Sequence, residues 1–281
     1  MRPALVCALV SLLLPNPCRA QELTLKRLVT PAAGGMSSSQ STHLHATAGQ
    51  PVAGFASATG LAHWIGFWVP STSGHDPLFP GGIAQAKLQP DGTMVALTGV
   101  VAASGPLQPG GFLYIGRADR ASGIRVQPLT DTAGICPGAV LSVTGTMDTT
   151  AEGERQVAGA LLSIDGAATP LVPLGMALKS AGGSDFGGPG AGQSGVTGGV
   201  GLNNIGLLAR AWGSVTGTDG GGLALDDASG VLLRLDLRNA PGPFPPGGRL
   251  EVTGMVSLTR DGPDLLPLLI PRSPEDIRDL D

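Results

Sequence analysis

The sequence predicts an all-β chain in which two small five-stranded barrels of related sequence follow one another. Residues 137–145 (PGAVLSVTG) and 246–254 (PGGRLEVTG) share a Pro-Gly turn, alternating apolar positions and a closing glycine. Upstream, residues 121–124 (ASGI) and 228–231 (ASGV) match at nearly the same offset, which indicates an internal duplication. The chain holds 45 glycines and 24 prolines among 281 residues, and the short Val/Leu/Ile runs between them favour many short strands joined by turns.

The first element in chain order is a predicted signal peptide, residues 1–20. Arg2 precedes an apolar run over residues 4–14, which is too short to span a bilayer. Two prolines follow, and small residues near Ala20 predict cleavage before Gln21. Acylation at Cys18 is a weaker alternative, because an Asn-Pro pair precedes it. The sequence therefore predicts a secreted, periplasmic or cell-surface protein without a membrane span.

The net charge disfavours phosphate backbones as partners, and the cysteine content limits disulfide formation. The chain carries 17 basic and 21 acidic residues, and losing Arg2 and Arg19 with the signal leaves a net charge of about −6. An acidic protein lacks the counterion release that drives binding to phosphate backbones, unless its charges are segregated. Cys136 is the one cysteine left after cleavage, so no intramolecular disulfide is expected. We expect Cys136 to be a small buried apolar residue.

Residues 21–70 are predicted to form a short β module, followed by a linker at residues 71–82. Alternating segments are joined by the turn at residues 47–51 (TAGQP), and the module ends in residues 66–68 (GFW). These two motifs resemble a short β module found near the start of secreted bacterial proteins. That resemblance implies no activity.

Residues 83–174 contain the first predicted barrel. A short lead-in helix over residues 84–88 should end at the Pro-Asp-Gly turn of residues 90–92. The strands that we expect are residues 94–103, 112–115, 123–127, 140–148 and 157–164. Gly99 inside the first strand predicts a bulge or sharp bend. Five strands with a longer connection between the third and fourth are typical of an OB-type Greek-key barrel.

Several motifs make the resemblance more specific. Residues 91–93 (DGT), 112–115 (FLYI) and 137–145 (PGAVLSVTG) resemble the YhcR-type OB-like modules of secreted bacterial proteins. Such modules also occur as accessory domains beside extracellular nucleases and phosphoesterases. No nuclease or phosphatase motif is found in this sequence.

The remaining chain is predicted to hold a hinge, a second barrel and a tail. Residues 175–204 are glycine-rich and are expected to be a flexible hinge with its two ends fixed to the barrels. Residues 205–271 supply the second OB-like barrel, and residues 272–281 form an acidic tail with a helical turn expected over residues 274–280. The strands that we expect in the second barrel are residues 208–215, 223–225, 231–237, 250–258 and 265–270.

Candidate catalytic and metal-binding residues are sparse. His43 and His45 lie two apart on one predicted strand and could chelate a metal, but nothing aligns a third ligand, so we interpret them as exposed strand residues. We interpret three acidic pairs as polar turn residues, in preference to acid/base or calcium sites. These pairs are Asp226 with Asp227, Asp261 with Asp264, and Glu152 with Glu154. We therefore predict no catalytic residue, no metal site and no cofactor.

One candidate ligand-binding site remains, in the first barrel. Phe112 and Tyr114 lie two apart on one strand and could form a stacking platform, as in proteins that bind single-stranded nucleic acids. Arg117, Arg120 and Arg125 are near them in the chain. The alternative is that both aromatic side chains line the barrel interior.

The second barrel lacks this platform in the sequence alignment. Leu223 and Leu225 align with the two aromatic residues, and Trp212 is the only large aromatic residue of that barrel.

Three function classes follow. The leading hypothesis is a secreted, non-catalytic protein whose tandem OB-like barrels are interaction or scaffold modules. The second is an extracellular protein that binds an oligonucleotide or oligosaccharide through the first barrel. The third, an enzyme, is disfavoured because the sequence supplies no assembled nucleophile, base or metal set. The partner is an unknown extracellular protein, glycan or oligonucleotide, since an OB-type fold alone does not fix function.

Overall fold

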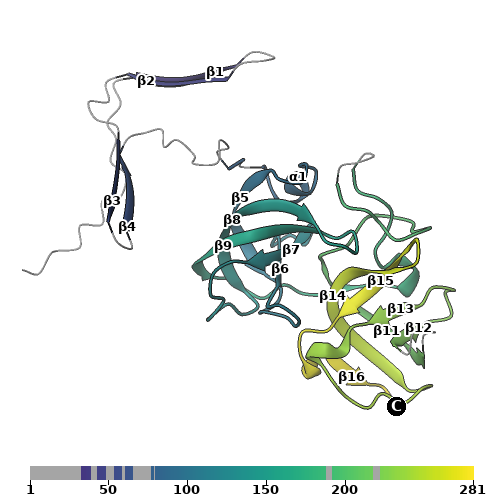
Figure 1. Ribbon diagram of the computed structural model, residues 1–281. Helices are drawn as coiled ribbons and strands as arrows, with labels where there is room; N and C mark the ends of the chain where they lie inside the picture. Colours follow the sequence, from purple (N-terminus) through teal and green to yellow (C-terminus); the bar gives the residue numbers. More distant parts are fainter. Residues whose placement is uncertain are drawn as a thin grey trace, which may run out of the picture. The chain divides into compact units, whose positions relative to one another are not determined.

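The structure is a computed structural model (Figure 1). It describes residues 77–78, 80–187, 192–217 and 222–281, together with four short strands in the N-terminal part of the chain. The chain divides into two units, Met1–Pro70 and Ser71–Asp281. The predicted signal peptide and most of the predicted linker lie outside the described residues.

The first unit contains two antiparallel strand pairs. β1 (Ala33–Ser38) pairs with β2 (His43–Ala48), and β3 (Gly54–Ala58) pairs with β4 (Leu61–Ile65). His43 and His45 both belong to β2, but their side chains lie outside the described residues, as do the predicted GFW motif and most of the predicted TAGQP turn.

The second unit begins with a closed five-stranded barrel, which confirms the all-β prediction for this part of the chain. Its elements are α1 (Ile83–Lys87), β5 (Met94–Ala102), β6 (Leu113–Gly116), β7 (Gly123–Pro128), β8 (Ala139–Thr149) and β9 (Arg155–Ala167). The strands close in the order β5-β6-β7-β9-β8, and the β7–β9 pair is parallel while the others are antiparallel. This order is compatible with an OB-like fold.

Gly99 gives β5 the bend that the sequence predicts. The pairing of β5 with β8 shifts register between Leu97 and Val100, and Gly99 has a φ of 65°. A side chain is disfavoured at this backbone angle, so glycine allows the strand to turn with the barrel.

A second ring of strands follows. Its strands are β11 (Leu208–Gly217), β12 (Leu223–Asp226), β13 (Leu233–Leu235), β14 (Arg249–Asp261) and β15 (Asp264–Ile270). They pair in the order β11-β12-β13-β15-β14, and β14 also pairs with β11 (Figure 1). Only the β13–β15 pair of this ring is parallel, as β7–β9 is in the first barrel. The two rings therefore have the same order and direction of pairing.

In both rings a short helical turn precedes the first strand and contributes to the apolar core. Ile83 and Ala86 of α1 belong to the first apolar core. Leu178 and Ala181, in and after η1 (Leu178–Ser180), belong to the second core. The composition of residues 175–204 predicts a flexible hinge, yet part of this segment packs into the core of the second barrel. Its glycine content concealed the few apolar residues that carry the packing.

The predicted acidic tail is also part of the sheet. A 3-10 turn, η3 (Pro274–Asp276), is followed by β16 (Ile277–Asp279), which pairs with β14, so the helical turn expected over residues 274–280 is limited to η3. At the other edge, β10 (Leu174–Gly175) pairs in parallel with β11. The strand expected over residues 231–237 is limited to β13, and a further 3-10 turn, η2 (Leu237–Asn239), begins at its expected end. No helix among the described residues is long and apolar enough to cross a membrane.

Cys136 corrects a sequence prediction, because it is exposed and not buried. Its neighbour Ile135 is only 7% exposed and belongs to the first core. The larger apolar side chain of Ile135 occupies the buried position in this segment, and Cys136 is left exposed.

We predict that the Cys136 thiol of a folded chain of residues 21–281 reacts fully with a water-soluble disulfide reagent. Because the side chain is already exposed, the reaction should need no unfolding. The measurement is the number of thiols titrated with and without denaturant. A thiol that reacts only after denaturant is added would contradict this placement.

Candidate functional site: the junction between the barrels

The predicted aromatic platform lies between the two barrels. Leu113 and Ile115 point into the first core, so Phe112 and Tyr114, at alternate positions, face outward from that barrel. Phe112 is 2% exposed and Tyr114 is 0% exposed. The alternative that these rings line the barrel interior is therefore wrong, because they are buried on its outer surface.

The second barrel supplies the apolar partners of this platform. Phe112 and Tyr114 form a cluster with Leu208, Met255 and Ile270, which come from β11, β14 and β15. The two rings meet edge to face, with centroids 5.9 Å apart. Burial of large apolar side chains from both barrels is the main stabilising contribution at such a contact.

A buried carboxylate lies beside this cluster. The Tyr114 hydroxyl donates to both carboxylate oxygens of Glu154, at 2.9 and 3.0 Å, and the Ser257 hydroxyl donates to one of them at 2.7 Å. Glu154 and Ser257 are each 2% exposed. Ser257 belongs to the second barrel, so this hydrogen-bonded group joins β6, the β8–β9 turn and β14. Glu154 does lie in a turn, as the sequence predicts, but its side chain is buried and bonded to the second barrel.

Burial controls the titration of this group. Removal from water raises the pKa of Glu154, and this effect exceeds the opposing effects of the Ser257 hydroxyl and of the nearby Arg125 charge. Burial, together with the Glu154 charge, raises the pKa of Tyr114 well above its usual value. Tyr114 therefore remains a protonated donor over the physiological pH range.

Lys87 is a second buried charge at the junction. Its Nζ donates to the Ile205 carbonyl at 2.7 Å, so it links α1 of the first barrel to the segment that leads into the second. Burial lowers the pKa of Lys87 from 10.5 to about 8, and the nearby Glu154 charge partly opposes this shift. Lysine was not singled out in the sequence, because one lysine in a short helix carries no signal of burial.

The three predicted arginines fall into two groups. The Arg125 guanidinium lies 3.8 Å from the centre of the Phe112 ring, and Arg125 pairs across the strands with Tyr114. Such stacking of a cation on a ring is favourable. Arg117 instead pairs with Asp119 in an exposed turn, and Arg120 lies in that same turn. The structure therefore brings Phe112, Tyr114 and Arg125 together, but not the other two arginines. Ligand binding by these residues stays a prediction.

The register of the second ring corrects the sequence alignment of the two barrels. Leu225 lies in the second core and Leu223 packs against it, so both point inward. The outward residue is Ala224, which pairs with Arg234 as Tyr114 pairs with Arg125. Ala224, and neither leucine, is thus the counterpart of Tyr114.

The glycine-rich segment adds a third link. Gln193 is 1% exposed; its side-chain oxygen accepts from the Arg155 amide at 2.8 Å, and its nitrogen donates to the Gly153 carbonyl at 3.1 Å. Backbones also meet directly, because a Cβ added to Gly206 would lie 2.6 Å from the Gly123 carbonyl oxygen. Only glycine allows this approach.

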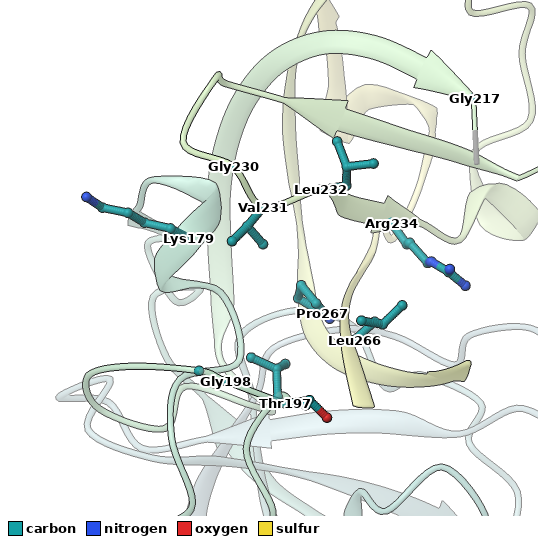
Figure 2. Close-up of a pocket in the computed structure, with 12 residues that line it drawn as sticks. Lys179, Thr197, Gly198, Gly217, Gly230, Val231, Leu232, Arg234, Leu266 and Pro267 are labelled. Atoms are coloured by element: carbon teal, nitrogen blue, oxygen red, sulfur yellow. The ribbon is translucent and has the colours of Figure 1, made fainter. Parts of the chain in front are cut away.

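A pocket of about 380 Å³ lies elsewhere on the second barrel. Thr197, Val231 and Pro267 are among its lining residues. Figure 2 shows the charged ends of Lys179 and Arg234 pointing away from it. Arg234 is paired with Asp261, with 2.5 Å between the charged atoms. This pocket therefore lacks the convergent polar groups that fix a ligand.

Within the described ranges, no group of three or more His, Cys, Asp or Glu side chains is arranged to hold a metal ion.

Comparisons with known proteins found a distant structural similarity. No family model matches the sequence, and no curated protein matches it. Among solved structures, the chain is similar to one described as a murine DNA binding protein bound with double-stranded DNA. The two share 9% sequence identity with a TM-score of 0.32, over 66% of this chain and 96% of the other. A likeness at this level carries no argument about function.

We predict that Ser257→Ala lowers the free energy of unfolding by about 1–3 kcal/mol, because it leaves a buried carboxylate with one donor fewer. The matched control is Ser142→Ala, since the Ser142 hydroxyl donates to Asp165 at an exposed site. That control should change stability by at most about 0.5 kcal/mol. Chemical denaturation measures both variants, and equal effects would contradict the junction as described.

We also predict that stability contributed at Lys87 rises with pH between about 8 and 10. The folded state, with its lowered pKa, releases the Lys87 proton before the unfolded state does, so deprotonation favours folding in this window. The raised pKa of Glu154 acts oppositely but at lower pH, where its contribution is lost as pH rises. The measurement is the unfolding free energy of wild type minus that of Lys87→Met at several pH values. A difference that stays flat or falls between these values would contradict the prediction.

Proposed function

We propose that the chain is an exported, non-catalytic protein whose two OB-like barrels form one rigid interaction module. The observation that carries the proposal is the burial of Phe112 and Tyr114 against the second barrel. In OB folds the face of the second and third strands is the usual ligand surface. Here the outward side of β6, the second strand, is used for a contact within the chain.

The nature of this contact supports a permanent association. It combines an apolar cluster, a fully buried hydrogen-bonded group at Glu154 and a close backbone approach at Gly206. Buried polar groups that satisfy one another specify a single arrangement, because any other arrangement leaves them without partners. Such a module presents its remaining surfaces to a partner, which we propose is an extracellular protein, glycan or oligonucleotide.

Export and ancestry rest on the sequence. The signal-peptide pattern of residues 1–20 supports export, and the DGT, FLYI and PGAVLSVTG motifs support kinship with YhcR-type OB-like modules. The repeated pairing order and the helical turn before each first strand support an origin by duplication.

A second candidate is oligonucleotide or oligosaccharide binding by the first barrel. The stacking of Arg125 on Phe112 favours it, because cation–aromatic pairs recur at sites that bind single strands. This function would require the barrels to separate, since the second barrel covers both aromatic rings.

Calorimetry of the mature chain tests the rigid module. We expect the residues of both barrels to unfold in one transition, and we expect Met255→Ala to lower its midpoint, because this residue is 0% exposed at the junction. Leu161→Ala is the control, since Leu161 is 53% exposed. Two separate transitions from residues 77–281, with only one shifted by Met255→Ala, would refute the module.

Titration with single-stranded DNA and with acidic glycans separates the two candidates. The rigid module predicts no salt-dependent binding at β6. Binding that is weakened by salt and by both Tyr114→Ala and Arg125→Ala would favour the second candidate.

A further inference from the structure

A row of polar and aromatic side chains crosses the outer face of the second barrel, away from β6. Ser214 on β11 pairs with Asp226 on β12 and with Arg249 on β14, so these three residues lie side by side on one face. Trp212 precedes Ser214 by two residues and therefore shares this face. Trp212 and Asp226 lie 14 positions apart in the sequence, and the strand register brings them to the same face.

This row lines a cavity of about 470 Å³. Trp212 and Leu280 form its apolar walls, and they are 52% and 45% exposed. The Leu280 amide donates to the Arg249 carbonyl at 2.9 Å, which holds the C-terminal segment beside β14. Trp212 is the one aromatic residue among the exposed large apolar side chains of the described part of the chain. An indole left this exposed on a strand that is paired on both sides is suited to pack against a ligand.

The Asp226 carboxylate and the Arg249 guanidinium can each form further hydrogen bonds. One Asp226 oxygen accepts from the Ala228 amide at 2.7 Å, which orients the carboxylate, while the described residues offer the other oxygen no donor. Within the same residues, no carboxylate lies at ion-pair distance from the Arg249 guanidinium. Asp227 differs, because its two oxygens accept from the Leu178 and Ser229 amides.

We infer that this cavity, formed by Trp212, Asp226, Arg249 and Leu280, binds a neutral oligosaccharide. A sugar ring has an apolar C–H face that packs on an indole, and hydroxyls that donate to a carboxylate and accept from a guanidinium. The cavity has a volume within the range usual for small-molecule sites. Asp226 and Asp227 outnumber Arg249, so a phosphate backbone would meet repulsion here.

The inference deepens the proposed interaction module by naming a ligand class for one of its free surfaces. It does not depend on the Tyr114–Glu154 junction, and none of the four residues that define the cavity belongs to the junction cluster.

The test is calorimetric titration of the full mature chain with three neutral probes: cellotetraose, xylotetraose and chitotetraose. We expect at least one to bind with an affinity that changes little between low and high salt. Trp212→Ala should weaken that binding about tenfold or more, and Asp226→Asn should weaken it several-fold. Trp212→Phe should restore part of it, because a smaller aromatic face remains. Leu232→Ala is the matched control, since it removes an exposed apolar side chain from the other pocket and should leave binding unchanged.

Several results would overturn the inference. These are an absence of binding to all three probes, binding that survives Trp212→Ala, and Trp212-dependent binding of single-stranded DNA or a polyproline peptide without binding of sugars. Circular dichroism of each variant shows whether it is folded, and Asp226→Asn tests the site without removing apolar volume. A single unfolding transition alongside a failed sugar titration would leave the rigid module standing and remove only this site.

Discussion

The structure of the second unit depends on how one buried carboxylate is satisfied. Glu154 lies in a turn of the first barrel and is buried, so bulk solvent does not solvate its carboxylate. Tyr114 from the same barrel and Ser257 from the other supply the hydrogen bonds that compensate its burial. Because one donor comes from each barrel, separating the barrels would leave this carboxylate incompletely bonded. This constraint favours one relative placement over many.

The two rings share one strand arrangement but differ in the side chains on their outer faces. Each has a helical turn before its first strand and one parallel pair in the ring. At the outward position of the second strand, however, one has Tyr114 and the other has the small Ala224. The first barrel therefore presents a large aromatic contact surface, whereas exposed aromatic surface in the second barrel is found at Trp212 on the first strand. Two rings with the same pairing order therefore have their aromatic contacts on different strands.

Much of the fold follows from local sequence, but little of the junction does. Alternating residues and the glycine at position 99 predict strand positions well, because both act through the neighbouring backbone. Glu154 carries no comparable signal, since a charged turn looks the same whether solvent or another barrel covers it. The outward position of Ala224 was missed because the sequence match aligned side chains without fixing the strand register. The composition of the glycine-rich segment predicts flexibility, but Leu178 packs in the second core and Gln193 hydrogen-bonds to the first barrel, so the segment is part of the packed structure.

The most direct measurement of the central claim is ¹⁵N relaxation of the chain in solution. The account predicts one rotational correlation time for the backbone amides of both barrels, because the junction holds them as a single body. Separate and shorter correlation times for the two barrels would contradict it, since they would show that the contact at Glu154 does not hold the barrels together.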